Sequence, residues 1–164
     1  MSELKITIFG VEHTLKVLEG AAHRAAHLEP AWEDIATDLM SLEAKVFASE
    51  GGAIGVTWPA LSPAYARWKA RHGFSPKILE RTGELRRSLT EKSSGDMVLE
   101  ITPDSLAFGT ALMVGSWFLG TLQQEGTRRM PARPIMPESE QQLPAGAVPR
   151  WLNWIGKYVV GEEA

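Results

Sequence analysis

The chain contains no cysteine, and no apolar run in it approaches the length of a membrane-spanning helix. Without thiols it has no disulfides, no thiolate metal sites and no cysteine nucleophile. A spanning helix needs about 18 or more consecutive apolar residues, so the sequence argues against a membrane protein. The first ten residues also lack the long apolar region of a signal peptide. We therefore expect a protein without membrane contact that is made and used in a reducing cytoplasm.

Recognisable catalytic motifs are missing as well. The sequence has no nucleophile elbow, no phosphate-binding P-loop and no H-E-x-x-H zinc motif. The glycine-rich run 51–55 follows a predicted helix, whereas a dinucleotide-binding loop follows a strand, so we interpret it as a connector. His23 and His27 lie one helical turn apart, but no third metal ligand is close in the sequence. We expect no catalysis, no metal and no cofactor.

Charge is unevenly distributed along the 164 residues. The net charge is −3, yet residues 1–50 carry nine acidic and four basic side chains, and residues 61–92 carry eight basic and three acidic ones. Residues 128–136 add three arginines. Zones of opposite sign are compatible with a plain solvated surface, and they also suit self-association, in which an acidic patch of one copy meets a basic patch of the next.

The first half of the chain is predicted to be mainly helical. One helix, capped by Thr14, ends before Pro30, and a longer helix covers Ala31–Glu50. The apolar residues of the longer helix form one stripe at helical spacing: Trp32, Ile35, Leu39, Leu42 and Val46. Ser62 as the cap and Pro63 at the first helical position start a third helix.

The second half is predicted to form strands and a last helix. Leu4–Ile8 already alternates like a strand with one buried face. Three further short strands are separated by turn residues: Leu85–Lys92, Met97–Thr102 and Ser105–Thr110. Two more helices are expected: a short one at Val114–Gln124 and an amphipathic one at Arg150–Val160. We predict an α+β fold in which N-terminal helices pack on a small antiparallel β-sheet (a meander), with a C-terminal helix. Residues 1–164 form one domain, with the last 20 or so at its periphery.

Six tryptophans need places in this small domain. Trp32 and Trp68 lie on apolar helix faces and are assigned to the core, and Trp58, before a proline, is expected to plug the core from a loop. Two aromatic pairs are left over: Trp117 with Phe118, and Trp151 with Trp154. Because tryptophan is a favoured anchor of protein interfaces, at least one pair is a candidate subunit contact.

Three motifs follow one another along the chain. They read W-P-A-L-S-P-A-Y-A-R-W-K at Trp58–Lys69, I-L-E-R-T-G-E-L-R-R-S-L-T at Ile78–Thr90, and M-P-A-R-P-I at Met130–Ile135. In this order they resemble the phage virion morphogenesis family, the Mu-like tail-completion or neck proteins of tailed bacteriophages and prophages. The resemblance spans roughly residues 30–140. It rests on Trp58, Leu61, Ser62 and Lys69, then on Leu79, Thr82, Gly83, Leu85, Ser88 and Leu89, and finally on Pro131, Ala132, Arg133 and Pro134.

Two departures from the family pattern are visible. Tyr65 stands where the first motif usually has threonine. Ahead of the third motif the family has a Tyr-Ala pair with His, Gln and Phe-Gly, of which only Gln124 and Gly126 remain here.

The resemblance implies a structural virion protein that acts in head–tail joining or tail completion. Such proteins resemble subunits of rings, often of six copies, around the DNA channel. The implied partners are further copies of the chain and other phage neck, connector, tail-tube or terminator proteins, with a passing contact to DNA in the channel and none to a membrane. The implied location is the virion, after assembly in the host cytoplasm.

We combine the arginines around the motifs with the spare aromatic pairs into one candidate interface: Arg86, Arg87, Trp117, Phe118, Arg128, Arg129, Arg133, Trp151 and Trp154. Arg133, fixed between Pro131 and Pro134, is expected to lie in a rigid strip that docks on the sheet or on a neighbour. The alternative is a small nucleic-acid-binding domain that uses the basic residues between 67 and 92 as a phosphate-binding face: Arg67, Lys69, Arg71, Arg86 and Arg87.

Overall fold

The computed structural model describes residues 11–162, so the strand predicted at Leu4–Ile8 lies outside the described residues. The helices are α1 (Val11–Ala25), α2 (Glu29–Ala48), α3 (Pro63–Arg71), α4 (Glu84–Thr90), α5 (Leu119–Glu125) and α6 (Ala147–Val160), with short 3-10 turns η1 (Gly52–Ile54) and η2 (Glu140–Gln142). The strands are β1 (Met97–Ile101), β2 (Leu106–Thr110), β3 (Met113–Val114) and β4 (Trp117–Phe118). The predicted α+β class, with N-terminal helices, a small antiparallel sheet and a C-terminal helix, is confirmed.

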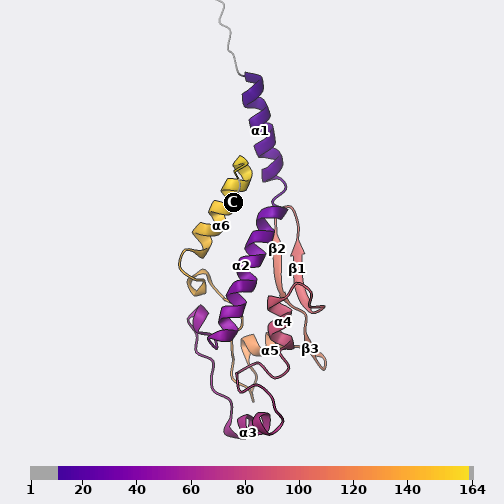
Figure 1. Cartoon of the computed structure of the whole chain (residues 1–164), viewed down its shortest axis with the longest axis vertical. Coiled ribbons are helices and arrows are strands. Elements are labelled where there is room, and N and C mark those ends of the chain that lie inside the picture. The colour runs from indigo at the N-terminus through magenta and orange to yellow at the C-terminus, as the bar shows by residue number, and fades with distance from the viewer. Residues whose placement is uncertain (1–10, 163–164) are drawn as a thin grey trace, which may run out of the picture.

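Helix α2 lies at the centre of the molecule (Figure 1). It begins beside Pro30, whose fixed φ suits the first turn of a helix, and its last turn runs into Gly51, which has a positive φ. Leu42, Val46 and Phe47 face the core and are buried. They join a buried cluster with residues of η1, α4 and three loops: Ile54, Trp58, Ile78, Leu85, Leu89 and Ile135. The predicted helix at Ala31–Glu50 is therefore confirmed.

Helix α1 continues beyond the start of α2 along the long axis of the molecule (Figure 1). The junction is held to the β1–β2 turn, where the Leu28 amide donates to the carbonyl of Pro103. Near its C-terminal end α1 also meets α6, and Arg24 Nε donates to the Val159 carbonyl over 2.9 Å. The remainder of α1 stands away from the body, so Leu15 and Leu18 are exposed.

The sheet is smaller than the predicted meander. Strands β1 and β2 form an antiparallel pair, with Met97 opposite Thr110 and Ile101 opposite Leu106, as the sequence predicts. The strand predicted at Leu85–Lys92 is wrong, because these residues form helix α4. Ser88 and Leu89 follow Leu85 by three and four residues, and all three are buried. This spacing places them on one face of a helix, whereas a strand would bury every second residue. A short hydrogen bond of 2.7 Å between Ser88 Oγ and Thr110 Oγ1 joins this helix to β2.

The helix predicted at Val114–Gln124 is only half right. Its first part turns back on itself as the β3–β4 hairpin, with Met113 opposite Phe118 and Val114 opposite Trp117, and the helix α5 starts only at Leu119. Gly115 in the turn has a φ of 61°, a left-handed conformation that favours glycine. The chain therefore presents Trp117 and Phe118 on a hairpin and not on a helix.

Helix α6 covers one side of α2. The Asp38 carboxylate of α2 accepts hydrogen bonds from Arg150 and from Trp151 Nε1. Arg150 also lies over the Trp154 ring. Within the described residues, none of the helices combines the length and apolar character needed to cross a membrane.

Candidate functional site

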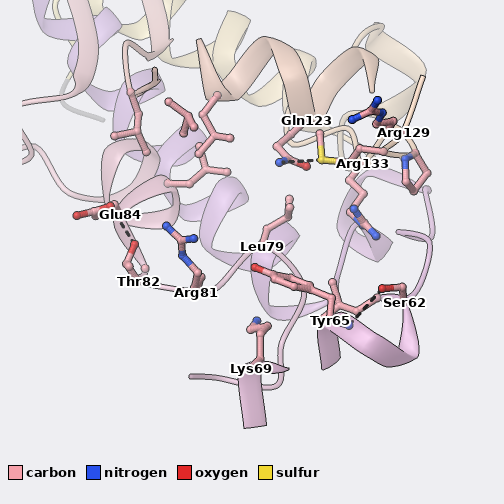
Figure 2. A pocket seen from close by; sticks show the side chains of 18 of the residues that line it. Ser62, Tyr65, Lys69, Leu79, Arg81, Thr82, Glu84, Gln123, Arg129 and Arg133 are labelled. Atoms are coloured by element: carbon pink, nitrogen blue, oxygen red, sulfur yellow. Dashed lines mark hydrogen bonds between the residues drawn. The ribbon is translucent and has the colours of Figure 1, made fainter. Parts of the chain in front are cut away.

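The three sequence motifs meet around one cavity of about 600 Å³ (Figure 2). The first motif contributes Leu61, Ser62 and Tyr65, and the start of α3 is fixed there because Ser62 Oγ accepts from the Tyr65 amide. The second and third motifs contribute the segments 79–85 and 130–133, and β3 and α5 complete the wall. Segments up to about 70 residues apart thus form a single site.

The first and third motifs hold each other. Trp58 is buried and its indole Nε1 donates to the carbonyl of Pro134 over 2.8 Å. In return, Arg133 Nε donates to the Pro59 carbonyl over 2.9 Å, and Nη2 to the Ala60 carbonyl over 3.3 Å. The prediction that Trp58 plugs the core from a loop is confirmed. Arg133 is buried, and burial lowers the pKa of its guanidinium group. Because its hydrogen bonds are made within the protein, it offers little surface to a neighbouring subunit.

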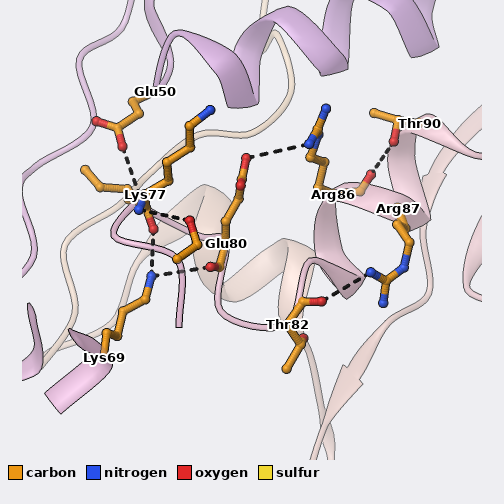
Figure 3. Close-up of polar contacts among 10 residues, drawn as sticks. Glu50, Lys69, Lys77, Glu80, Thr82, Arg86, Arg87 and Thr90 are labelled. Atoms are coloured by element: carbon orange, nitrogen blue, oxygen red, sulfur yellow. Dashed lines mark hydrogen bonds and ion pairs between the residues drawn. The ribbon is translucent and has the colours of Figure 1, made fainter. Parts of the chain in front are cut away.

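The first and second motifs are joined by a buried lysine. Lys69 Nζ donates to the carbonyls of Lys77 and Glu80, over 2.7 and 3.4 Å (Figure 3). Between these two acceptors lies Leu79, whose φ of 58° is strained for a branched residue. Glu50 adds a bond on the other side, since its Oε1 accepts from the Ile78 amide over 2.9 Å. Burial lowers the pKa of Lys69, and the ammonium group acts as a clamp on the loop.

Gln124 secures the third motif from α5. Its Oε1 accepts from the amides of Ile135 and Met136 over 3.0 and 3.2 Å, and its Nε2 donates to the Met136 carbonyl over 3.0 Å. This side-chain amide supplies the hydrogen bonds that a neighbouring strand would give to an extended segment. Gly126 is needed in the same place, because a Cβ there would lie 2.6 Å from the Ala132 nitrogen. Both residues that the sequence keeps from the family pattern thus position the loop.

The cavity itself has apolar walls, cationic groups and one unsatisfied amide. Arg81 and Arg129 line it, and within the described residues neither guanidinium has an ion-pair or hydrogen-bond partner. Gln123 is 7% exposed, and its Oε1 accepts no hydrogen bond from any described residue, while Nε2 contacts Met130 Sδ at 3.7 Å. A buried amide oxygen without a donor costs about 1–3 kcal/mol. The site is therefore suited to a ligand that brings a hydrogen-bond donor, apolar groups and a negative charge.

The predicted interface residues do not form one continuous patch. Trp117 and Phe118 are 65% and 54% exposed on the β3–β4 hairpin, and Arg128 is exposed in the following loop. The others have partners or lie elsewhere: Arg86 lies 4.0 Å from Glu80, Arg87 donates to the Thr82 carbonyl, Arg129 lines the cavity, Arg133 is buried, and Trp151 and Trp154 lie half-buried on α6.

Two further assignments change with the structure. Trp68 is not in the core; it is 37% exposed, within an aromatic group on α3 that includes Tyr65, His72 and Phe74. Lys69, assigned to a phosphate-binding face under the nucleic-acid alternative, is buried and bonded to backbone. That face is left with Arg67 and Arg71 on α3 and the partnered arginines of α4.

Sequence reasoning did not identify Arg81 or Gln123 as lining a cavity. Arg81 lay within a motif but had no apparent partner, and the only signal for Gln123 was its position one residue before the retained Gln124. As for metal ligands, the described part of the chain brings no three His, Asp or Glu side chains together. His23 and His27 are close, with ring centroids 4.8 Å apart, and both are exposed.

Comparison with known proteins agrees with the motifs. The model of the phage virion morphogenesis family matches residues 10–144, which include all three motifs and the whole cavity. No curated protein and no solved structure matches the chain. A match over most of the chain establishes the relationship, and the chain belongs to the phage virion morphogenesis family.

Proposed function

We propose that the protein is a non-catalytic subunit of a ring that completes the phage tail or joins it to the head. The observation that carries the proposal is the β3–β4 hairpin. The four residues of its two strands are all apolar and all exposed: Met113 by 44%, Val114 by 53%, Trp117 by 65% and Phe118 by 54%. A cluster of exposed large apolar side chains is typical of a protein–protein contact.

The hairpin also has little support of its own. A two-stranded hairpin with two residues in each strand is marginal in water, because it has few hydrogen bonds and buries little surface. Packing against a neighbour would cover its aromatic side chains and stabilise it. In this proposal the neighbours are further copies of the chain together with neck, connector or tail-tube proteins, and assembly takes place in the host cytoplasm before the ring enters the virion.

Replacing the hairpin anchors tests this function. A phage or prophage without the gene is complemented with the parent chain or with the Trp117→Asp/Phe118→Asp variant. We expect the parent to restore infectious particles, and the variant to reduce the titre by at least a hundredfold while unjoined heads and tails accumulate in electron micrographs. Leu152→Asp is the matched control, because Leu152 is 63% exposed on α6, away from the hairpin. Full complementation by the hairpin variant would refute the proposal.

A further inference from the structure

The cavity has the features of a binding site for an extended peptide. Met113 and Val114 of β3 line it, and β3 pairs only with β4 among the described strands, so its second edge carries no strand. An unpaired edge beside apolar pockets is the usual acceptor of an added strand. The cavity volume of about 600 Å³ lies within the usual range of ligand-binding pockets.

Two polar features specify the ligand further. The buried Oε1 of Gln123 has no donor in the part of the chain that the structure describes, and a peptide N–H would supply one. The guanidinium groups of Arg81 and Arg129 have no partner among residues 11–162, whereas Glu84 on the same wall already accepts from Thr82 Oγ1 over 2.9 Å. The fitting peptide is therefore apolar on one face and carries a carboxylate.

The first residues of this chain have that composition. They read M-S-E-L-K-I-T-I-F-G, in which Leu4, Ile6 and Ile8 alternate with polar residues. Such alternation gives an extended segment one apolar face that needs to be covered. In an extended segment Glu3 and Lys5 lie on the face opposite the three apolar residues. On that face Glu3 would meet the exposed Arg81 and Arg129 at the rim of the cavity, and Lys5 would meet the exposed Glu84.

This segment cannot reach the cavity of its own chain. Helices α1 and α2 follow one another along the molecule, and α3 and α5 lie toward the far end of α2 (Figure 1). Both of these helices contribute residues to the cavity. The 15 and 20 residues of α1 and α2 extend about 22 and 30 Å, whereas ten fully extended residues span at most about 36 Å. Any N-terminal segment in the cavity must therefore come from another copy.

We propose that residues 3–9 of one copy bind in this cavity of the next copy as a strand added beside β3. The inference rests on the proposed function, because it names the contact that joins neighbours. The start of α1, to which the donor segment is joined, and the elements that line the acceptor cavity lie at opposite ends of the described residues, so the contact is head-to-tail. A head-to-tail contact leaves a free donor and a free acceptor after each addition and ends only when a ring closes.

A peptide-binding experiment tests the site. A fluorescent peptide of residues 2–10 is titrated with the full chain carrying Ile6→Asp and Ile8→Asp, which removes competition from the N-terminal segments of other copies. We expect saturable binding in fluorescence anisotropy, at least tenfold weaker for a peptide with Ile6→Asp. In a chain that also carries Arg81→Glu and Arg129→Glu, the Glu3→Lys peptide should bind better than the parent peptide. Equal binding of the parent and Ile6→Asp peptides, or no binding, overturns the proposal.

The absence of cysteine allows a second, independent test. Copies with Ile6→Cys are mixed with copies carrying Val114→Cys and oxidised mildly. We expect a disulfide-linked pair of chains on a non-reducing gel, and much less of it with Ala107→Cys, an exposed position on β2. If a chain with both Ile6→Cys and Val114→Cys instead closes on itself as a monomer at high dilution, the head-to-tail contact is wrong.

The two proposals can fail separately. If the Ile6→Asp/Ile8→Asp chain restores infectious particles as well as the parent while the Trp117→Asp/Phe118→Asp chain does not, the strand contact is refuted and the assembly function stands. If all variants complement fully, the assembly function is refuted as well.

Discussion

Trp58 and Arg133 each hydrogen-bond to the backbone beside the other, across 75 positions of sequence. The indole donates to Pro134, and the guanidinium donates to Pro59 and Ala60. The two side chains therefore form a reciprocal link between the loop that leads into α3 and the loop that follows α5.

Because Trp58 and Arg133 each hold the other's loop, the energetic coupling between the two side chains can be measured. We expect Arg133→Ala to lower the free energy of unfolding by about 2–3 kcal/mol, since hydrogen bonds of a charged group are lost in the interior. Trp58→Phe removes one hydrogen bond and should cost about 1–3 kcal/mol. Because each loop holds the other, the double variant should lose less than the sum, with a coupling of about 1 kcal/mol in urea unfolding. Arg128→Ala, exposed in the same loop, serves as the control and should change stability by less than about 0.5 kcal/mol. Strict additivity would contradict the link.

Replacing the buried lysine should loosen a defined segment. In Lys69→Met the carbonyls of Lys77 and Glu80 lose their donor, and the bonds that hold the strained backbone around Leu79 are reduced to the one from Ile78 to Glu50. We expect amide hydrogen exchange of residues 77–83 to accelerate by at least tenfold, with little change in β1 and β2. Lys77→Met, at an exposed position, is the matched control. Equal exchange in the two variants would show that Lys69 does not clamp the loop.

Glu43 should make stability depend on pH. It is 0% exposed on α2, neither carboxylate oxygen has a hydrogen-bond partner among the described residues, and burial raises its pKa to about 8 from the ordinary 4.5. Between these values the unfolded chain releases the proton while the folded chain keeps it. Stability is therefore greatest at low pH and falls as the pH rises toward 8, by an amount on the order of 5 kcal/mol.

Urea unfolding at pH 5 and pH 8 measures this loss. The isosteric variant Glu43→Gln cannot ionise, so most of the difference between the two pH values should disappear. Asp34→Asn, an exposed carboxylate on the same helix, should leave the difference unchanged. A parent chain that is equally stable at both pH values would show that Glu43 does not keep its proton in the folded state.

Two glycines with a similar positive φ should respond differently to alanine. Gly126 has a φ of 73°, and a Cβ there meets the backbone of Met130 and Ala132, whereas Gly115 has a φ of 61° and open space around it. Gly115→Ala carries only the left-handed backbone cost of about 1–2 kcal/mol. Gly126→Ala also pushes the third motif out of place, so it should lose clearly more stability in thermal unfolding. The reverse order would contradict the packing of this loop.

The long-range features of the site were beyond sequence reasoning. Helix α2 was predictable because its apolar stripe extends over about four turns and proline marks its start. Helix α4 was not recognised because it has only seven residues. Four of them are charged or hydroxyl-bearing and are not buried, so only the buried Leu85, Ser88 and Leu89 show the helical spacing. The burial of Lys69 was not predicted either, because lysine is rarely buried. The carbonyls that accept its hydrogen bonds belong to a loop whose path no local sequence pattern specifies. The motifs marked the right segments, but their convergence on one cavity depends on contacts between residues up to about 75 positions apart.

The projecting helix α1 behaves as a lever arm. It is fixed at its base, where Leu28 bonds to Pro103 and Arg24 bonds to Val159, while Leu15 and Leu18 nearer its other end are exposed. Over a length of about 22 Å, a turn of roughly 10° at the base carries the tip by about 4 Å. Small adjustments at residues 26–28 therefore translate into large adjustments at the tip. In the proposed ring, the subunits can absorb accumulated angular error there while the core of each subunit stays unchanged.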